Sequence, residues 1–213
     1  MYYEGLGVDQ NYQKAFEWIE QAANQGYANA QFDLGVIYHE GIAVEQDEIK
    51  KLEWFQQAAN QGYTDAQFNL GIMYHESIGI EQGYQKAMQW YLLAANNGSF
   101  DAQNNIGNFY EYGYGVTQDY DKAFEWYTKA ADQGLDVAQL NIGGLYENGY
   151  GVPQDYDKAF EWYKKAAEQG NQEASNRIGR LVMNDKIDDT GITIYSTQET
   201  GLTLGYIEDS LRN

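Results

Sequence analysis

Two histidines are the residues whose types and spacing first suggest chemistry. His39 and His75 stand 36 residues apart in the chain, and acidic residues lie close to both in the sequence. Imidazole and carboxylate groups are zinc ligands, but histidines on two stacked helix pairs would lie roughly 10 Å apart, too far to bind one ion directly. The histidine pair therefore does not predict a metal site.

The groups that catalysis requires are not brought together by any spacing in the chain. No nucleophile, base and metal ligand are grouped, and no glycine-rich phosphate loop follows an expected strand, because the glycines end helices. Carboxylate pairs are abundant, yet an acidic chain forms them by chance, so they are a weak indication of glycoside hydrolysis. We expect no enzyme, no cofactor and no metal.

Charge and composition narrow the choice of partner. The chain has 213 residues and a formal net charge of -19, which disfavours a nucleic acid or an anionic membrane surface as a partner. It has no cysteine and no apolar run long enough to cross a membrane. We expect a soluble protein that binds a protein or peptide with a basic or neutral surface. Its compartment stays open: cytoplasmic, or periplasmic or secreted if an upstream signal has been removed.

A repeat of 36 residues organises most of the chain. In the unit 137–173, apolar residues at helical spacing predict a first helix that ends at Gly149. The second helix covers "YDKAFEWYKKAAEQG", with Asp155 as its N-cap and Gly170 as its C-cap glycine. Two columns mark the period: Trp18, Trp54, Trp90, Trp126 and Trp162, and Gly35, Gly71, Gly107, Gly143 and Gly179. We interpret both columns as packing residues of a stacked array.

The repeat resembles a known family. The "LGxxY" pattern of Leu34, Gly35 and Tyr38, the turn "GYGVPQD" and the helix "DKAFEWYKKAAEQG" are similar to those of the Sel-1-like repeat family, within the tetratricopeptide repeat superfamily. The resemblance implies an all-α fold, a right-handed α-α superhelix (solenoid) of antiparallel helix pairs with a concave groove. It also implies a bacterial scaffold or adaptor that binds proteins.

The ends of the array differ from its middle. We expect the solenoid to cover residues 1–183, as a partial first repeat, four full units and a partial last helix. Residues 184–213 form a short non-repeat tail that caps the array, binds a partner or is disordered. Met1 and Tyr2 fall in the columns of Ile37 and Tyr38. A helix missing before them would expose Phe16, Trp18 and Ile19, and we expect self-association through this end.

Three residues depart from the repeat. Glu48 stands where other units have Tyr, Lys51 stands where they have Ala, and Ser77 replaces a helix-ending glycine. We expect looser or rearranged turns at these two places.

By analogy with the superfamily, the residues beside the Leu-Gly pair of each first helix line the groove. Asparagines there can hydrogen-bond the backbone of an extended peptide, and Phe32 and Phe68 would form an apolar patch. The alternatives are solvated asparagines and phenylalanines that pack on neighbouring helices. The predicted partner-binding residues are Phe32, Asp33, Val36, Phe68, Asn69, Ile72, Asn104, Asn105, Asn108, Asn141, Arg177 and Arg180.

Three functions remain after this sequence analysis. The leading one is a non-catalytic scaffold or adaptor that holds a partner peptide or loop in the concave groove. The alternative is an inhibitor or immunity protein that blocks a toxin, an effector or an enzyme, since an acidic face steers onto a basic target. An enzyme with an unrecognised site ranks last.

Overall fold

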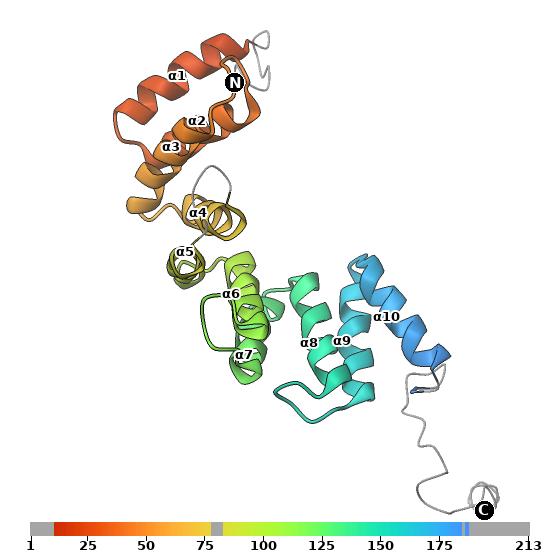
Figure 1. Cartoon of the computed structure of the whole chain (residues 1–213). Helices are drawn as coiled ribbons and strands as arrows, with labels where there is room; N and C mark the ends of the chain where they lie inside the picture. Colours follow the sequence, from red (N-terminus) through yellow and green to blue (C-terminus); the bar gives the residue numbers. More distant parts are fainter. Residues whose placement is uncertain (1–10, 78–82, 185, 188–213) are drawn as a thin grey trace, which may run out of the picture. The chain divides into compact units, whose positions relative to one another are not determined.

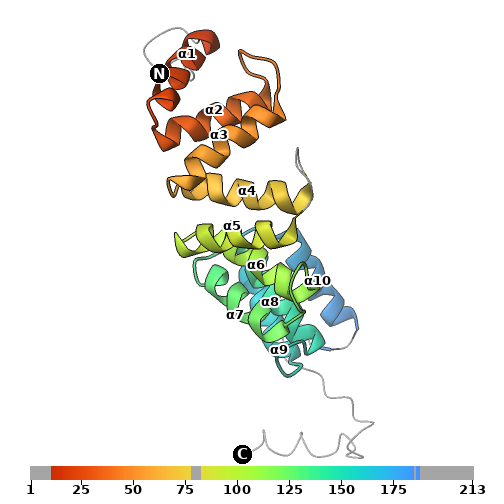
Figure 2. The same cartoon turned by 60° about the vertical axis from the view of Figure 1, so that its left-hand side comes forward.

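The structure, a computed structural model, describes residues 11–77, 83–184 and 186–187. In these residues the chain forms ten α-helices and no β-strand (Figures 1 and 2). The chain divides into two compact units, Met1–Ala138 and Gln139–Asn213. The helices are α1 Tyr12–Asn24, α2 Ala28–Glu40, α3 Glu48–Asn60, α4 Thr64–Glu76, α5 Tyr84–Asn96, α6 Phe100–Tyr112, α7 Tyr120–Ala131, α8 Asp136–Asn148, α9 Tyr156–Glu168 and α10 Gln172–Met183.

Each repeat contributes one helix pair. We call the first helix of each pair an A helix (α2, α4, α6, α8 and α10) and the second a B helix (α3, α5, α7 and α9, with α1 in the same class). In the first unit, each helix from α1 to α6 packs against the helix that follows it. The expected all-α solenoid of helix pairs is therefore confirmed.

Glycine allows the two helices of a pair to approach. An added Cβ at Gly35 would lie 2.6 Å from the Phe55 ring, closer than real Cβ atoms come. Gly71, Gly107 and Gly143 meet the rings of Tyr91, Tyr127 and Tyr163 in the same way. The aromatic residue of each B helix therefore packs directly on the backbone of its A helix.

A lysine ties each B helix to the A helix before it. Asp119 is the N-cap of α7 and accepts from the backbone N–H of Lys122 at 3.0 Å. The Lys122 ammonium also pairs with Asp119 at 3.0 Å and lies 5.2 Å from the centre of the Tyr110 ring at the end of α6. Asp155, the predicted N-cap, is confirmed, and it forms the same set with Lys158 and Tyr146.

A column of buried glutamines joins consecutive repeats. Gln67 donates to the carbonyl of Ala59 at 3.2 Å, and its side-chain oxygen accepts from Asn97 at 3.0 Å. Gln31 and Gln103 make equivalent bonds. Each glutamine thus links the ends of two B helices through the A helix between them. The sequence interpretation missed this column, although a glutamine recurs every 36 residues at Gln31, Gln67, Gln103 and Gln139.

The departures from the repeat are accommodated locally. Ser77 ends α4 in the left-handed conformation, at φ 62°, as Gly41 and Gly113 do for α2 and α6. Lys51 is buried, and its ammonium lies 3.2 Å from both Glu48 and His39. Residues 78–82 of the second turn lie outside the described residues.

The expectation for the first helix was partly wrong. Trp18 is 61% exposed, but Phe16 is buried and Ile19 is half-buried. Phe16 faces α2, where its ring makes an edge contact with Tyr38, so it needs no preceding helix to cover it. At the other end, Ile187 is buried in one cluster with Ile178, Leu181 and Val182. Residues 185 and 188–213 of the predicted tail lie outside the described residues.

Candidate partner-binding face

The predicted groove residues of the first unit lie on α2, α4 and α6. We call the partly exposed side of these three A helices the A face, and we describe the equivalent residues of the second unit separately. The A face comprises Phe32, Asp33, Val36, Asp65, Phe68, Asn69, Ile72, Asp101, Asn105 and Asn108.

The apolar residues of the A face pack on neighbouring helices and are still half-exposed. Phe32 stacks on Phe55 with ring centres 5.0 Å apart and lies 5.2 Å from the Tyr63 ring. Phe68 packs against Tyr91 at 5.9 Å. Val36 and Ile72 border the same clusters. These residues therefore lie at the edge of the hydrophobic core, with part of their surface exposed to solvent.

The asparagines do not form a uniform ladder. Asn69 donates to the Asp65 carbonyl within its own helix at 2.8 Å, and Asn108 accepts from the Tyr127 hydroxyl at 2.7 Å. Asn105 is half-buried beside Tyr91. Asn104 is only 7% exposed, which contradicts its expected place on the groove surface. It occupies the column of Phe32 and Phe68, whose side chains turn toward the neighbouring helices.

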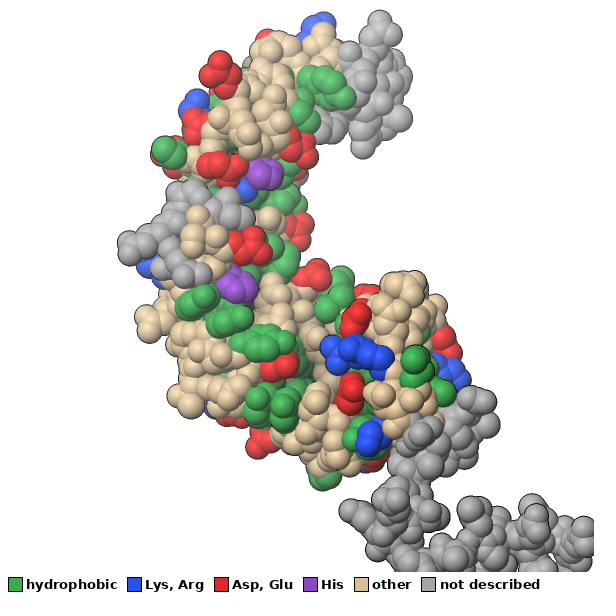
Figure 3. Space-filling model, turned by 45° about the vertical axis from the view of Figure 1, so that its right-hand side comes forward, with side chains coloured by type: hydrophobic (Ala, Val, Ile, Leu, Met, Phe, Trp, Pro, Cys, Tyr) green, Lys and Arg blue, Asp and Glu red, His purple; other side chains and the backbone are tan. Residues whose placement is uncertain are grey.

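The lysines of the first unit are confined to one class of helix. The A helices α2, α4 and α6 carry six acidic residues and neither lysine nor arginine, whereas all six lysines of residues 11–138 lie on B helices. Figure 3 shows acidic and hydrophobic side chains beside both histidines on one face of this unit. The acidic residues are Asp33, Glu40, Asp65, Glu76, Asp101 and Glu111.

Three of these carboxylates have no cation of their own in the described part of the chain. None of the ion pairs there involves Asp33, Asp65 or Asp101. Although Asp33 and Asp101 are exposed as whole residues, packing around their carboxyl groups removes water and raises the pKa of each. Burial, then the charges of Asp65 and Asp33, raise the pKa of Tyr63. The A face therefore holds negative charge that no ion pair among the described residues neutralises.

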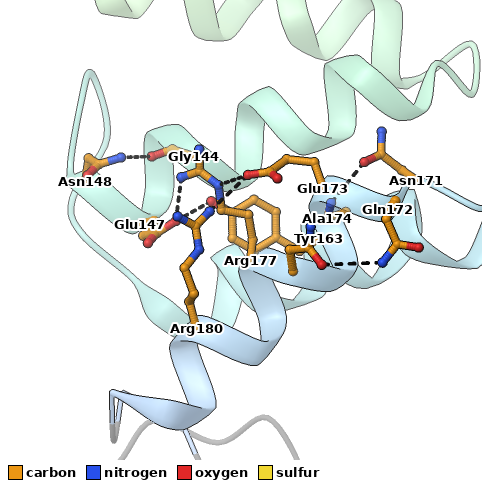
Figure 4. A network of polar contacts seen from close by, with 11 residues as sticks. Gly144, Glu147, Asn148, Tyr163, Asn171, Gln172, Glu173, Ala174, Arg177 and Arg180 are labelled. Atoms are coloured by element: carbon orange, nitrogen blue, oxygen red, sulfur yellow. Dashed lines mark hydrogen bonds and ion pairs between the residues drawn. The ribbon is translucent and has the colours of Figure 1, made fainter.

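The second unit differs, because its arginines are already paired. Arg177 donates to Glu173 at 2.8 Å and lies 3.5 Å from Glu147, and Arg180 also binds Glu173, at 2.9 Å (Figure 4). The Tyr163 hydroxyl donates to Glu147 in the same network. Asn141 lies on α8 and is half-buried. The predicted arginine end of the groove is thus a closed network of ion pairs.

The two histidines have different surroundings. His39 Nδ1 lies 2.7 Å from Glu48 and 3.2 Å from the Lys51 ammonium. His75 lies among the rings of Tyr84, Phe109 and Tyr114, and burial lowers its pKa. Among the described residues, no group of three or more His, Cys, Asp or Glu side chains could hold a metal ion. None of the described helices has the length and hydrophobicity needed to span a membrane.

Three tyrosines of the B helices were not singled out as functional candidates. The hydroxyl of Tyr127 donates to Asn108 and to Glu111 at 2.6 Å, and that of Tyr163 donates to Glu147. The hydroxyl of Tyr91 is buried without a partner. The sequence does indicate this difference between the tyrosines. His75, Glu111 and Glu147 occupy the same position in successive repeats, and two of them are carboxylates that can accept from a tyrosine, whereas the residue beside Tyr91 is His75.

Comparison with known proteins matches every repeat. The Sel1 repeat model matches residues 1–27, 28–63, 64–99, 100–135 and 136–171. No curated protein sequence matches the chain.

Solved structures show the same fold. The chain is 38% identical to a Sel1 repeat protein from Oxalobacter formigenes, with a TM-score of 0.79, over 85% of this chain and 74% of that one. It is 37% identical to c5321, a protective antigen present in uropathogenic Escherichia coli strains, with a TM-score of 0.81, over 86% of this chain and 39% of that one. Immunity protein PA5088 from Pseudomonas aeruginosa shares 22% identity, with a TM-score of 0.55, over 89% of this chain and 69% of that one. This last similarity concerns the fold alone.

Proposed function

This chain belongs to the Sel1 repeat family, and on that premise we propose that it is a non-catalytic scaffold that binds a positively charged segment of another protein on its A face. Proteins of this family are generally protein-interaction scaffolds and are generally non-catalytic. The finer proposal, a basic partner on this face, rests on the charge of the first unit.

The observation that carries the proposal is the confinement of the lysines of the first unit to the B helices. The A helices α2, α4 and α6 carry six carboxylates and no lysine or arginine, so they attract a cationic partner over a distance of about a Debye length, roughly 8–10 Å at physiological salt. The B helices carry the lysines, so they do not share this attraction. Electrostatic complementarity of this kind selects the partner and speeds its encounter.

The A face also offers contacts that become stronger once the partner is docked. The carboxylates of Asp33 and Asp101 are already partly desolvated, so a lysine or arginine that pairs with them displaces little further water. The half-exposed rings of Phe32 and Phe68 provide apolar surface beside them. Buried aromatic anchors with a charged rim are typical of protein interfaces.

The inhibitor or immunity role has weaker support. The immunity proteins among the structural neighbours share 22% identity with this chain, a level that supports the fold and not the target. We therefore do not carry that role further.

The test compares two variants of the full chain with equal net charge. The A-face variant combines Asp33→Asn, Asp65→Asn and Asp101→Asn, and the control combines Glu17→Gln, Glu53→Gln and Glu125→Gln on B helices. Each immobilised protein captures partners from a lysate of the source cells, and quantitative mass spectrometry identifies them. We expect a partner that binds the wild type and the control and is lost from the A-face variant.

Two outcomes would count against the proposal. A partner retained equally by both variants would bind elsewhere, and a partner lost from both would respond to net charge alone. Circular dichroism of all three proteins checks that each one is folded.

A further inference from the structure

One buried hydroxyl on the A-face side has no partner. Tyr91 is fully buried, and its hydroxyl makes no hydrogen bond within the described residues. A buried hydroxyl without a hydrogen-bond partner destabilises the folded protein. The preceding repeat has Phe55 in this column, so the fold accepts a ring without a hydroxyl here.

The equivalent tyrosines show where the Tyr91 hydroxyl is directed. The rings of Tyr91 and Tyr127 are both seated on the glycine of their A helix, Gly71 and Gly107. The Tyr127 hydroxyl reaches Asn108 and Glu111, which are partly exposed on α6. Beside Tyr91, the positions equivalent to Asn108 and Glu111 are occupied by Ile72 and His75. The Tyr91 hydroxyl therefore has neither the amide oxygen nor the carboxylate that accept from Tyr127.

The buried Tyr91 ring contacts side chains of both neighbouring A helices. The ring lies between Phe68 of α4, at 5.9 Å, and Phe109 of α6, at 5.6 Å. Burial raises the pKa of Tyr91, an interaction with the Asn105 side chain lowers it and the charge of Glu76 raises it. Asn105 and Phe68 are only half-buried. A subsite at this hydroxyl requires the Asn105 side chain to rotate away from it, which is a fast and inexpensive motion.

We propose that Tyr91 and Asn105 form a subsite for a main-chain carbonyl of a docked basic segment. The carbonyl accepts from the Tyr91 hydroxyl, the rotated Asn105 amide donates to the same segment, and the exposed Glu76 attracts a lysine or arginine that follows in it. This inference rests on the proposed function and adds to it the position of one backbone contact. A carboxylate ligand is disfavoured, because the subsite has Glu76 beside it and no lysine or arginine on α4 or α6.

The first test measures the free protein. Tyr91→Phe removes a hydroxyl without a partner, so its melting temperature should equal or exceed that of the wild type. Tyr127→Phe is the matched control, and it should lower the melting temperature because it leaves Glu111 without its donor. If Tyr91→Phe lowers the melting temperature as much as Tyr127→Phe does, the hydroxyl is already bonded in the free protein and the proposal is wrong.

The second test measures binding of a small probe to the full chain by NMR. The probe is N-acetyl-lysine-N-methylamide, which carries two main-chain amides and one cation. We expect its titration to shift the Asn105 side-chain amide resonances, with affinity about five-fold lower for Tyr91→Phe and unchanged for Tyr127→Phe. The matching glutamate probe should bind more weakly than the lysine probe.

The outcomes separate this inference from the function on which it rests. Absence of a shift at Asn105, or a shift that is equal in Tyr91→Phe, overturns the subsite. That result leaves the capture experiment with the A-face variant unaffected. If the A-face variant and its control capture the same partners while the lysine probe still shifts the Asn105 resonances, the basic partner is overturned and the carbonyl subsite is kept.

Discussion

In four repeats, the glycine in the middle of the A helix contacts an aromatic ring of the next B helix, whereas the glycine of α10 contacts none. Replacement of this glycine by alanine should therefore be harmful in those four repeats and harmless in α10. Gly107→Ala places a Cβ against the Tyr127 ring, which is fully buried and has no room to move. We expect Gly107→Ala to lower the free energy of unfolding by about 2–3 kcal/mol, measured by urea denaturation.

Gly179 provides the matched control for this prediction. It occupies the same column in α10, and an added Cβ there meets no atom within 4 Å. Gly179→Ala should raise stability by about 0.5–1 kcal/mol, because alanine is the better helix former. Equal losses in the two variants would mean that the glycines serve helix geometry and not ring packing.

Removal of a desolvated carboxylate from the A face should stabilise the folded protein, although it should weaken binding of the partner. Since the folded pKa of Asp33 is raised, its ionised form destabilises the folded state at neutral pH, and this effect disappears as pH falls through the raised pKa. Asp33→Asn should therefore raise the melting temperature at pH 7, with a difference from wild type that narrows in acid. Thermal scans from pH 7 to about pH 3 test it.

A control removes the same charge from the outer side of α1. Glu17→Gln changes the net charge equally at an exposed position. A rise in melting temperature as large as that of Asp33→Asn would attribute the effect to overall charge repulsion, and not to the local environment of Asp33.

At the scale of the helices, the residue that ends α4 is the weak point of the turns. Ser77 adopts the left-handed conformation that Gly113 adopts at the end of α6, with φ of 62° and 73° respectively. A residue with a Cβ is disfavoured in this conformation, so Ser77→Gly should stabilise the protein by about 1 kcal/mol. The reverse change, Gly113→Ser, should destabilise it by a similar amount. A chemical denaturation series of both variants tests the pair, and changes of the same sign would contradict the explanation.

The helix pairs could be predicted from sequence because their signals are local. The tryptophan and glycine columns, Asp155 as an N-cap and Gly170 beyond the end of α9 all depend on spacing within one repeat. The buried glutamines were missed because glutamine within a helix usually indicates a solvated surface. Gln67 shows its role only when its partners Ala59 and Asn97, in the two flanking B helices, are known.

The candidate site was predicted less well, because exposure depends on the neighbouring helix. Asn104 was expected on the surface since it stands beside Asn105, yet it turns inward in the column of Phe32 and Phe68. Arg177 was expected to bind a partner, yet Glu147, 30 residues away in sequence, already pairs with it. Pairing at this separation cannot be derived from one repeat alone.

At the scale of the whole molecule, the excess of acidic residues predicts how association depends on salt. With a formal net charge of -19 and an A face without lysine or arginine, the approach of a basic partner is accelerated by long-range attraction. The association rate of a captured partner should fall roughly ten-fold between about 0.05 M and 0.5 M salt, as measured by stopped-flow fluorescence. An association rate that does not change with salt would contradict electrostatic steering.

The lysine that joins neighbouring helices affects how a repeat protein of this kind can gain repeats in evolution. Tyr110, Asp119 and Lys122 lie within 13 residues of one another, and Tyr146, Asp155 and Lys158 repeat the set 36 residues later. A duplication of any 36-residue stretch that contains Asp119 or Asp155 therefore copies or restores a complete junction. Gene duplication can lengthen the array one unit at a time without a compensating mutation, and selection can then change the surface of the new copy.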